Sequence, residues 1–300
     1  MPLKSLFITI VKLLICGFMY YVGVVVGGMA ASLLQLPPPS MPPGADGPTV
    51  MAYLLLGSPV LALALALLAR GMTGAFVTRA LILTFLMWIA NTLNTQLEAA
   101  IFTTNASDFG FSLVSFFVAS LLCGGAVAWL FPPAAPGGGF AAAWQKFFAQ
   151  RSVVGWAWRL PLAAVAFMPI YFFFGLLVVP FIIEYYTQNM YGLQSPPLER
   201  LLLVLFVRSV LFLLACLPVL AVWQGTRRHL TLALGLALFV LVGFLGLFSA
   251  HWLPLSVRVP HAIEILADEF VYAWVLTALL VKGEAARQQV PRPVGRGAMA

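Results

Sequence analysis

The chain has 300 residues, of which 62% are hydrophobic and 8% are charged, and its formal net charge is +7. Soluble domains carry about a quarter charged residues, so this composition excludes a soluble globular protein. The apolar residues gather in runs of about twenty or more, and each run is long enough for a helix to cross a hydrocarbon core about 30 Å thick. We therefore predict an all-α integral membrane protein.

Eight such runs follow one another, and each predicts one transmembrane helix: residues 6–34, 49–69, 80–102, 109–131, 160–186, 201–223, 230–250 and 262–281. The first run is too long for a signal peptide, so we expect an uncleaved helix. Gly23 and Gly27 lie at the small-residue spacing that lets another helix approach closely. Pro161, Pro169 and Pro180 lie within the fifth run and predict a kink there.

Residues 132–159 form the longest connection and contain the segment FAAAWQKFFAQR. Helical spacing puts four aromatic side chains of this segment on one face: Phe140, Trp144, Phe147 and Phe148. This pattern is typical of a helix lying on the membrane surface, and a short soluble helix is the alternative. Residues 1–281 form the predicted transmembrane domain, and the basic, Pro- and Gly-rich residues 282–300 predict a disordered cytoplasmic tail.

Lysine and arginine are distributed unevenly between the two sides that alternate along the predicted chain path. One side holds thirteen of them: Lys4, Lys12, Arg70, Arg79, Lys146, Arg151, Arg159, Arg227, Arg228, Lys282, Arg287, Arg292 and Arg296. The opposite connections hold only Arg200 and Arg258. The positive-inside rule makes the richer side cytoplasmic, so we expect both termini in the cytoplasm and a multi-pass protein of the bacterial inner membrane. Because the basic residues fall in gaps between apolar runs, they indicate orientation and no nucleic-acid partner.

Two segments indicate an internal duplication. YYVGVVVGG in the first run resembles FFFGLLVVP in the fifth, which aligns Gly23 with Gly175. Four helices followed by four equivalent ones would form a parallel repeat, as in some transporters. We take this 4+4 repeat as a hypothesis.

Polar residues recur at three- and four-residue steps on two predicted helices, which places them on one helical face. The third helix carries Thr84, Trp88, Asn91, Asn94, Thr95 and Glu98, and the eighth carries His261, Glu264, Asp268 and Tyr272. A stripe of this polarity is costly against lipid. Together with Glu184 of the fifth helix and Arg208 of the sixth, these stripes predict one water-accessible cavity that opens outward.

The candidate ion- or substrate-binding residues are therefore Asn91, Asn94, Glu98, Glu184, Arg208, Glu264 and Asp268. For each residue taken alone, an interhelical hydrogen bond or ion pair is the alternative interpretation. A metal site is a further hypothesis, because His261 and Glu264 are three residues apart on a helix and can hold one ion between them. No HExxH or CxxC motif accompanies them, and no motif indicates a cofactor.

The leading functional hypothesis is a small transporter or permease whose outer carboxylates bind a cation, a proton or a cationic solute. Asp268 and Glu98 would carry the ion or proton, and Arg208 would supply the counter-charge. One alternative is a membrane enzyme acting on a lipid or lipid-linked substrate at the outer leaflet, with Glu264 or His261 as general base. Another is a non-catalytic subunit whose polar stripes dock the helices of membrane-protein partners.

Overall fold

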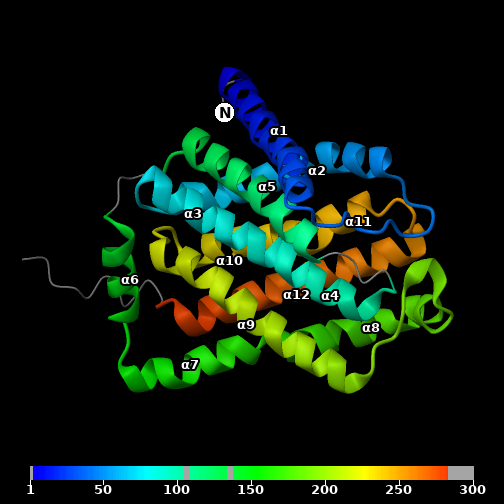
Figure 1. Ribbon diagram of the computed structural model, residues 1–300. Coiled ribbons are helices and arrows are strands. Elements are labelled where there is room, and N and C mark those ends of the chain that lie inside the picture. The colour runs from blue at the N-terminus through cyan, green and yellow to red at the C-terminus, as the bar shows by residue number, and fades with distance from the viewer. Residues whose placement is uncertain (1–2, 105–108, 134–137, 283–300) are drawn as a thin grey trace, which may run out of the picture.

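The chain folds into a bundle of long helices in the computed structural model, which describes residues 3–104, 109–133 and 138–282 (Figure 1). Within these ranges, five long helices are single elements: α1 (Leu3–Leu33), α2 (Gly47–Gly71), α5 (Phe109–Leu130), α9 (Leu198–Val222) and α12 (Leu255–Leu280). Three more combine consecutive elements: α3 (Phe76–Met87), η1 (Trp88–Leu93) and α4 (Asn94–Phe102); α7 (Val153–Val165) and α8 (Phe167–Thr187); α10 (Arg227–Phe239), η3 (Val240–Phe244) and α11 (Leu245–Ser249). The short helices α6 (Phe140–Phe148) and η2 (Met190–Gly192) lie in connections.

Seven of the long helices are long and apolar enough to cross a membrane, judged by length and composition over the described residues. The chain is therefore an all-α, multi-pass membrane protein. The remaining long helix, α12, has 26 residues, but three acidic residues interrupt its apolar stretch: Glu264, Asp268 and Glu269. The eighth crossing, the cytoplasmic position of the termini and the identity of the membrane stay predictions.

The helix that corresponds to the fifth predicted run begins at Val153, earlier than hydropathy indicates. The Ser152 side chain accepts a hydrogen bond from Gly155 N at 3.1 Å and caps the first turn. The helix is interrupted at Ala166, between α7 and α8. Pro169 has no N–H to bond to the carbonyl four residues earlier, which accounts for the interruption. The backbone at Ala166 is helical, with φ −62° and ψ −29°, so the kink stays a prediction.

Helix α12 also begins earlier than predicted, at Leu255 instead of Ala262. Its first turns contain Arg258 and His261, so hydropathy assigns them to a loop although they are helical. As a consequence, Asp268 lies near the middle of the helix and not in its first two turns. The acidic residues of α12 are therefore deeper in the bundle than the sequence indicates.

The two ends of the bundle differ in charge. At one end, α2 meets α3 and α9 meets α10, and α6 runs across this end (Figure 1). We call it the basic end, because its described lysines and arginines include Lys12, Arg70, Arg79, Lys146, Arg151, Arg159, Arg227, Arg228 and Lys282, with no described acid among them. The opposite, acidic end carries Asp46, Glu98, Glu184, Glu199 and Glu264, with Arg200 and Arg258.

At the basic end, the turn between α2 and α3 pairs with the turn between α9 and α10 through an isolated antiparallel β-bridge. Thr73 N donates to Val222 O at 3.0 Å, and Gln224 N donates to Gly71 O at 2.9 Å. The donor residues Thr73 and Gln224 are 151 positions apart in the sequence. The acceptor residues Gly71 and Val222 are 151 positions apart as well. The two bonds are therefore reciprocal, because each turn offers the other an equivalent donor and an equivalent acceptor.

Both helices that leave these turns change to π-helix at similar distances from their starts. Helix α3 runs for 12 residues before η1, and α10 runs for 13 residues before η3. The side chain of Asn91 in η1 donates through Nδ2 to the carbonyl oxygen of Leu241 in η3 at 2.6 Å. Short π-helical segments inside α-helices occur often at functional sites, and here the two segments contact each other.

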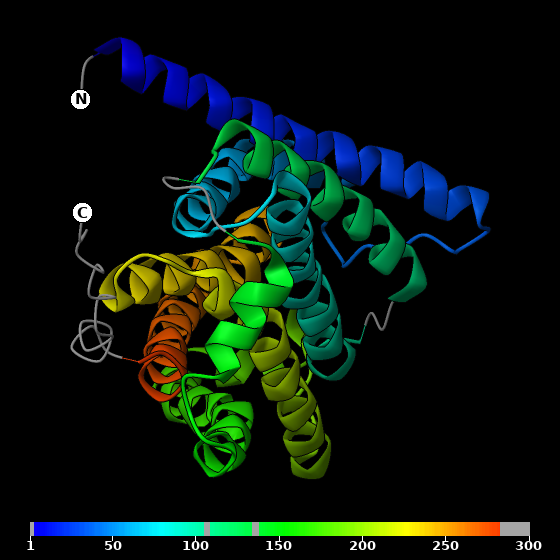
Figure 2. The same ribbon diagram turned by 90° about the vertical axis from the view of Figure 1, so that its left-hand side faces the viewer.

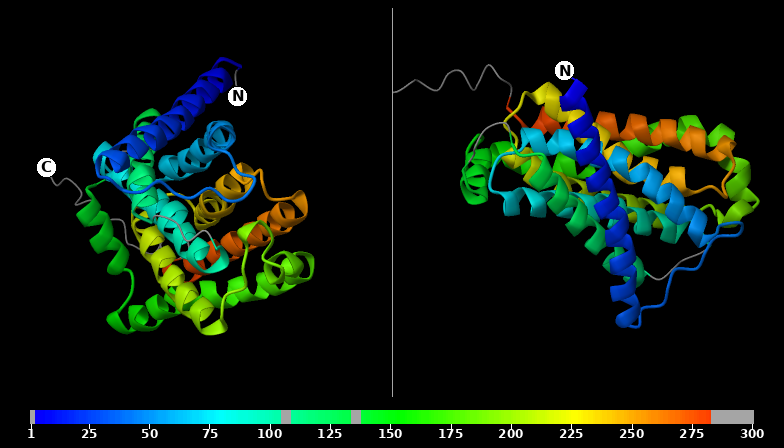
Figure 3. Two further views of the ribbon diagram at one scale, coloured as in Figure 1. Left: turned by 45° about the vertical axis from the view of Figure 1, so that its right-hand side comes forward. Right: turned by 90° about the horizontal axis from the view of Figure 1, so that it is seen from above.

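Helix α1 crosses the other long helices obliquely and packs along α5 (Figures 2 and 3). A Cβ atom built on Gly23 would lie 2.4 Å from Ala119 Cα, and one built on Gly27 would lie 2.4 Å from Ser115 O. No side chain fits at either position without moving the backbone of α5. The small-residue spacing of α1 thus has its predicted role.

Helix α6 places its predicted aromatic face partly against the bundle. Phe147 is buried, and its ring centroid lies 5.2 Å from that of Trp156 on α7. Trp156 Nε1 donates to Phe148 O at 2.7 Å. Whether the rest of this face meets a membrane surface stays a prediction.

Candidate functional site

A cavity of about 490 Å³ lies at the acidic end, between α4, α8, α11 and α12. Much of its wall is apolar, and η3 contributes Val242 and Gly243. The polar residues that line it are Thr95, Glu98, Thr103, Tyr171, Tyr186, Ser195, His261 and Glu264. An apolar cavity with a few converging polar groups is typical of a small-molecule site.

The ion pair between Arg208 and Glu98 joins α9 to α4 beside this cavity. Arg208 Nη2 donates to Glu98 Oε2 at 2.8 Å. Phe167, Tyr171 and Phe212 surround the guanidinium, with ring centroids 5.8, 5.8 and 6.0 Å from Cζ. At this distance aromatic faces attract a cation, so the rings favour the guanidinium in this position, and Glu98 lines the cavity.

A second polar group, formed by Glu264, His261 and Tyr186, lines the cavity from α12 and α8. His261 Nδ1 lies 2.9 Å from Glu264 Oε2, and His261 Nε2 lies 3.1 Å from the Tyr186 hydroxyl. When Glu264 is ionised, Nδ1 carries the proton and donates it, which leaves Nε2 to accept from Tyr186. Gly175 makes room for the carboxylate, because a Cβ atom there would lie 3.2 Å from Glu264 Oε1.

Two further acids lie behind the cavity on α12. Asp268 and Glu269 are buried, at 2% and 0% exposure. Among the described residues, Asp268 Oδ1 and both carboxylate oxygens of Glu269 have no hydrogen-bond partner, and neither do Arg208 Nε and Nη1. Both acids lie within electrostatic range of Arg208 and Glu98. Among the described residues, Arg208 bonds to the carboxylate of Glu98 alone, while Glu264, Asp268 and Glu269 lie on α12 in the same part of the bundle. We call Arg208 and these four acids the acid cluster.

The acid cluster has an excess of negative charge when every carboxyl is ionised. One guanidinium cannot neutralise four carboxylates, and an unpaired charge in a dry interior is strongly unfavourable. Protons, a bound cation or a protonated His261 must supply the missing positive charge. The cluster is therefore suited to take up and release protons or cations.

The other predicted site residues lie elsewhere. Asn91 joins η1 to η3, and its Oδ1 accepts from the Tyr20 hydroxyl at 3.3 Å. Asn94 is buried and donates to Ile89 O within its own helix at 3.2 Å. Neither amide lines the cavity. Glu184 is exposed and accepts from Gln188 Nε2 at 3.0 Å, away from the other acids.

Sequence reasoning omitted Glu269, Tyr171 and Tyr186 from the candidate residues. Glu269 follows Asp268 in the sequence but lies outside the helical face that Glu264 and Asp268 share. A search for polar residues on one face therefore does not select it. Neighbouring helices cover more than one face of α12, since it contacts both α8 and α10. The two tyrosines lie in a strongly apolar run, where their hydroxyl groups give no periodic signal.

Among the described residues, no group of three or more His, Cys, Asp or Glu side chains could hold a metal ion. The hypothetical pair of His261 and Glu264 therefore has no third ligand of these types there. His261 and Glu264 contact each other directly through one nitrogen and one oxygen. The ordinary interpretation of this contact is a hydrogen bond between them.

Comparisons with protein-family models, with curated proteins and with solved structures found no match for this chain.

Proposed function

We propose that the chain is a small transporter that couples movement of a cationic solute to protons through the acid cluster. The observation that carries this proposal is the Arg208–Glu98 ion pair beside an apolar cavity, with Glu264 in the cavity wall and Asp268 and Glu269 buried on the same helix. Protonatable acids inside a helical membrane domain are the groups from which proton pathways are built. The cavity wall is suited to the apolar part of a solute, and the carboxylates to its positive charge.

Each part of the site has a distinct role in this proposal. Glu98 and Glu264 line the cavity and meet the solute first. Asp268 carries the coupled proton, because it is buried and lies within electrostatic range of both. Arg208 supplies the group that pairs with Glu98 when no solute is bound. Binding a cation beside Glu98 then favours release of the proton from Asp268.

We also propose that the bundle is a parallel duplication of four helices plus four. The pairing of the α2–α3 turn with the α9–α10 turn supports it, because the two turns hold the same place in each half, and so do the similar positions of η1 and η3. Two pairs of like residues stand at the same separation of 151 positions: Tyr20 with Tyr171, and Ser58 with Ser209. Repeats of this kind are common in transporters, which bind substrate between the repeats.

The ionisable residues depart from the repeat. At the same separation, Arg208 corresponds to Gly57 and Glu98 to Ser249. In the first half, α1 and α5 pack too closely for a cavity, with Gly23 against Ala119. A duplicated bundle with one charged site is the arrangement that these differences support.

The test is solute-dependent proton flux. The purified full chain is reconstituted in vesicles that contain a pH-sensitive dye, and a panel of cationic solutes is added outside. We expect at least one cation to change the internal pH. Asp268→Asn, which keeps the shape of the side chain but cannot ionise, should abolish the change.

The matched control is Glu199→Gln, which removes an exposed acid at the same end of the bundle. It should leave the flux intact. Solute-driven flux that persists in Asp268→Asn, or the absence of any flux with the wild-type chain, contradicts the proposal.

A membrane enzyme is the second candidate, and the contact of His261 with Glu264 beside an apolar wall favours it. This pair has the composition of a general base whose orientation is set by a carboxylate. Turnover of a lipid-linked substrate that is lost in His261→Gln, without proton flux in the wild-type chain, would support the enzyme over the transporter.

A further inference from the structure

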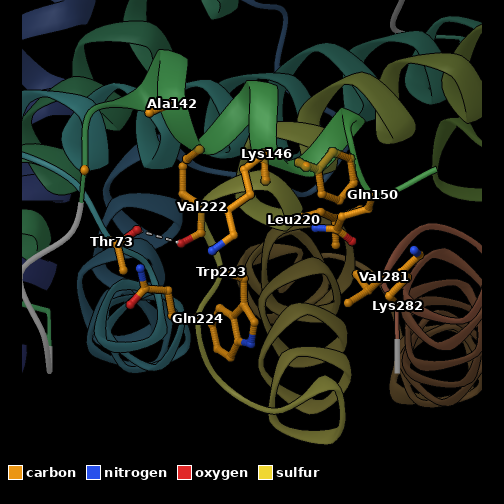
Figure 4. A pocket seen from close by; sticks show the side chains of 14 residues that line it. Thr73, Ala142, Lys146, Gln150, Leu220, Val222, Trp223, Gln224, Val281 and Lys282 are labelled. Atoms are coloured by element: carbon orange, nitrogen blue, oxygen red, sulfur yellow. Dashed lines mark hydrogen bonds between the residues drawn. The ribbon is translucent and has the colours of Figure 1, made fainter. Parts of the chain in front are cut away.

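A second cavity, of about 720 Å³, lies at the basic end of the bundle. The ends of α2, α9 and α12 form one side of it, and α6 forms the other (Figure 4). Thr73, Trp223 and Gln224 line the first side, and Lys146 and Gln150 line the second. This cavity has no part in the proposed transport site.

Helix α6 is held in place over this cavity by specific contacts. Phe147 is 2% exposed and packs on Trp156. Trp156 Nε1 donates to Phe148 O, which ties the end of α6 to the start of α7. The wall that carries Lys146 is thus a packed helix.

The charge of the cavity has one sign. Its ionisable lining residues are Lys146 and Lys282, and among the described residues neither forms an ion pair. Lys146 extends from α6 toward Val222 and Trp223 (Figure 4). Beside the cavity, burial lowers the pKa of Arg151, and the positive charges of Arg159 and Arg227 lower it further. The surroundings therefore favour a negatively charged ligand.

We propose that this cavity binds a phosphate-bearing anion. Lysine ammonium groups are common partners of phosphate oxygens. The buried Oε1 atom of Gln150 has no hydrogen-bond partner in the part of the chain that the structure describes, and this amide turns readily to present its NH₂ group to an acceptor. Phe147, Trp223 and Val281 supply apolar surface beside the lysines.

Two sources offer this chemistry: the headgroup of an anionic phospholipid and a soluble phosphate. Basic pockets between transmembrane helices on the cytoplasmic side bind anionic headgroups in other membrane proteins. The apolar surface beside the lysines suits an acyl chain, whereas a soluble anion needs only the donors.

The experiment compares the full chain in nanodiscs of phosphatidylcholine with nanodiscs that also contain phosphatidylglycerol. Melting temperature and retention of phosphatidylglycerol in native mass spectra are measured. Inorganic phosphate is titrated against the phosphatidylcholine sample. Stabilisation by phosphatidylglycerol alone assigns the site to a lipid headgroup, and stabilisation by inorganic phosphate assigns it to a soluble anion.

The double variant K146Q/K282Q should weaken binding of whichever anion stabilises the wild-type chain by roughly tenfold to thirtyfold, because each lysine near a membrane surface contributes to anion attraction. Lys4→Gln removes an exposed lysine of α1 outside the cavity and should leave binding unchanged. Ala142→Trp keeps both lysines but fills the space beneath α6, and it should also weaken binding.

Three results would overturn the proposal. The first is that neither anion stabilises the wild-type chain. The second is that anion binding survives in K146Q/K282Q or in Ala142→Trp. The third is that Lys4→Gln weakens binding as much as the double variant does. Because none of these measurements involves proton flux, the proposal succeeds or fails independently of the transporter proposal.

Discussion

Arg208 and Glu98 form an ion pair whose two partners face different surroundings: 1% of the Arg208 side chain is exposed, against 29% of Glu98. The arginine belongs to the buried interior together with Asp268 and Glu269, and the glutamate belongs to the cavity. The pair thus marks the boundary between the accessible part of the acid cluster and its buried part. A ligand that displaces Glu98 from Arg208 changes the electrostatic balance of the buried acids directly.

Replacing Arg208 should therefore cost more stability than replacing Glu98. Arg208→Gln leaves four carboxyl groups without their cation, and removal of one partner of a buried pair typically costs about 3–5 kcal/mol. Glu98→Gln should cost less, because Asp268 and Glu269 remain near the guanidinium. Thermal melting of both variants in one detergent measures the order. A Glu98→Gln variant less stable than Arg208→Gln would contradict it.

Filling the space that Gly175 leaves beside Glu264 should reduce proton flux more than it reduces the stability of the fold. In Gly175→Ala the new Cβ atom would meet Glu264 Oε1 at 3.2 Å, so the carboxylate must shift by a few tenths of an ångström. We expect proton flux to fall roughly threefold to tenfold, because small displacements of reacting groups have large effects on rate.

The control for this variant is Gly246→Ala. Gly246 also lines the cavity, but nothing lies within 4 Å of a Cβ atom placed there. Equal flux in the two alanine variants would show that contact with Glu264 is unimportant.

Gly23 should be among the least replaceable residues of α1. Gly23→Ala puts a Cβ atom 2.4 Å from Ala119 Cα, which forces α1 and α5 apart. Overpacking of this kind costs about 1–3 kcal/mol. Gly125→Ala is the comparison, since its Cβ atom meets nothing within 4 Å and alanine is favoured over glycine in a helix by about 0.5–1 kcal/mol. Melting temperatures should fall for the first variant and hold or rise for the second.

The cap of α2 predicts a pH effect on stability. The hydrogen bonds from Thr49 hold the pKa of the Asp46 carboxyl below 3.8, and the nearby His251 lowers it further. Because the folded-state pKa is depressed, the stabilisation is present above the unfolded-state pKa and is lost as pH falls through the folded-state value.

Asp46→Asn tests this effect. Asparagine caps a helix as well as aspartate does but cannot titrate, so the melting temperature of the variant should depend less on pH in the acidic range than that of the wild-type chain. Parallel melting curves for the two proteins across that range would contradict the assignment.

Several features of the bundle could be predicted from sequence because they depend on local composition. The apolar runs at 109–131 and 201–223 match α5 and α9 to within a few residues, since the length of an apolar run determines whether a helix can cross a membrane. The interruption between α7 and α8 is explained by proline chemistry, and the close approach of α1 and α5 by the spacing of small residues. The start of α12 was missed, because a polar helical turn that packs on protein has the same hydropathy as a loop.

The members of the candidate site depended on contacts between distant segments. Helical spacing correctly put Glu264 and Asp268 on one stripe, but it also selected Asn91, whose amide instead joins η1 to η3. Predicted depth added Glu184, which lies on the surface, and helical spacing did not select Glu269. Periodicity reports which face of its own helix a residue occupies and contains no information about which helix that face meets.

The amino-acid sequence alone determined that this chain is a helical membrane protein and that its acids and its basic residues are divided between opposite ends, because hydrophobic length and charge order are properties of the linear chain. Only the tertiary structure decided that Arg208 meets Glu98, that two turns 151 positions apart pair reciprocally, and that each end of the bundle has a cavity. Those features arise from the packing of side chains brought together across more than a hundred residues, and local patterns do not specify which partners meet.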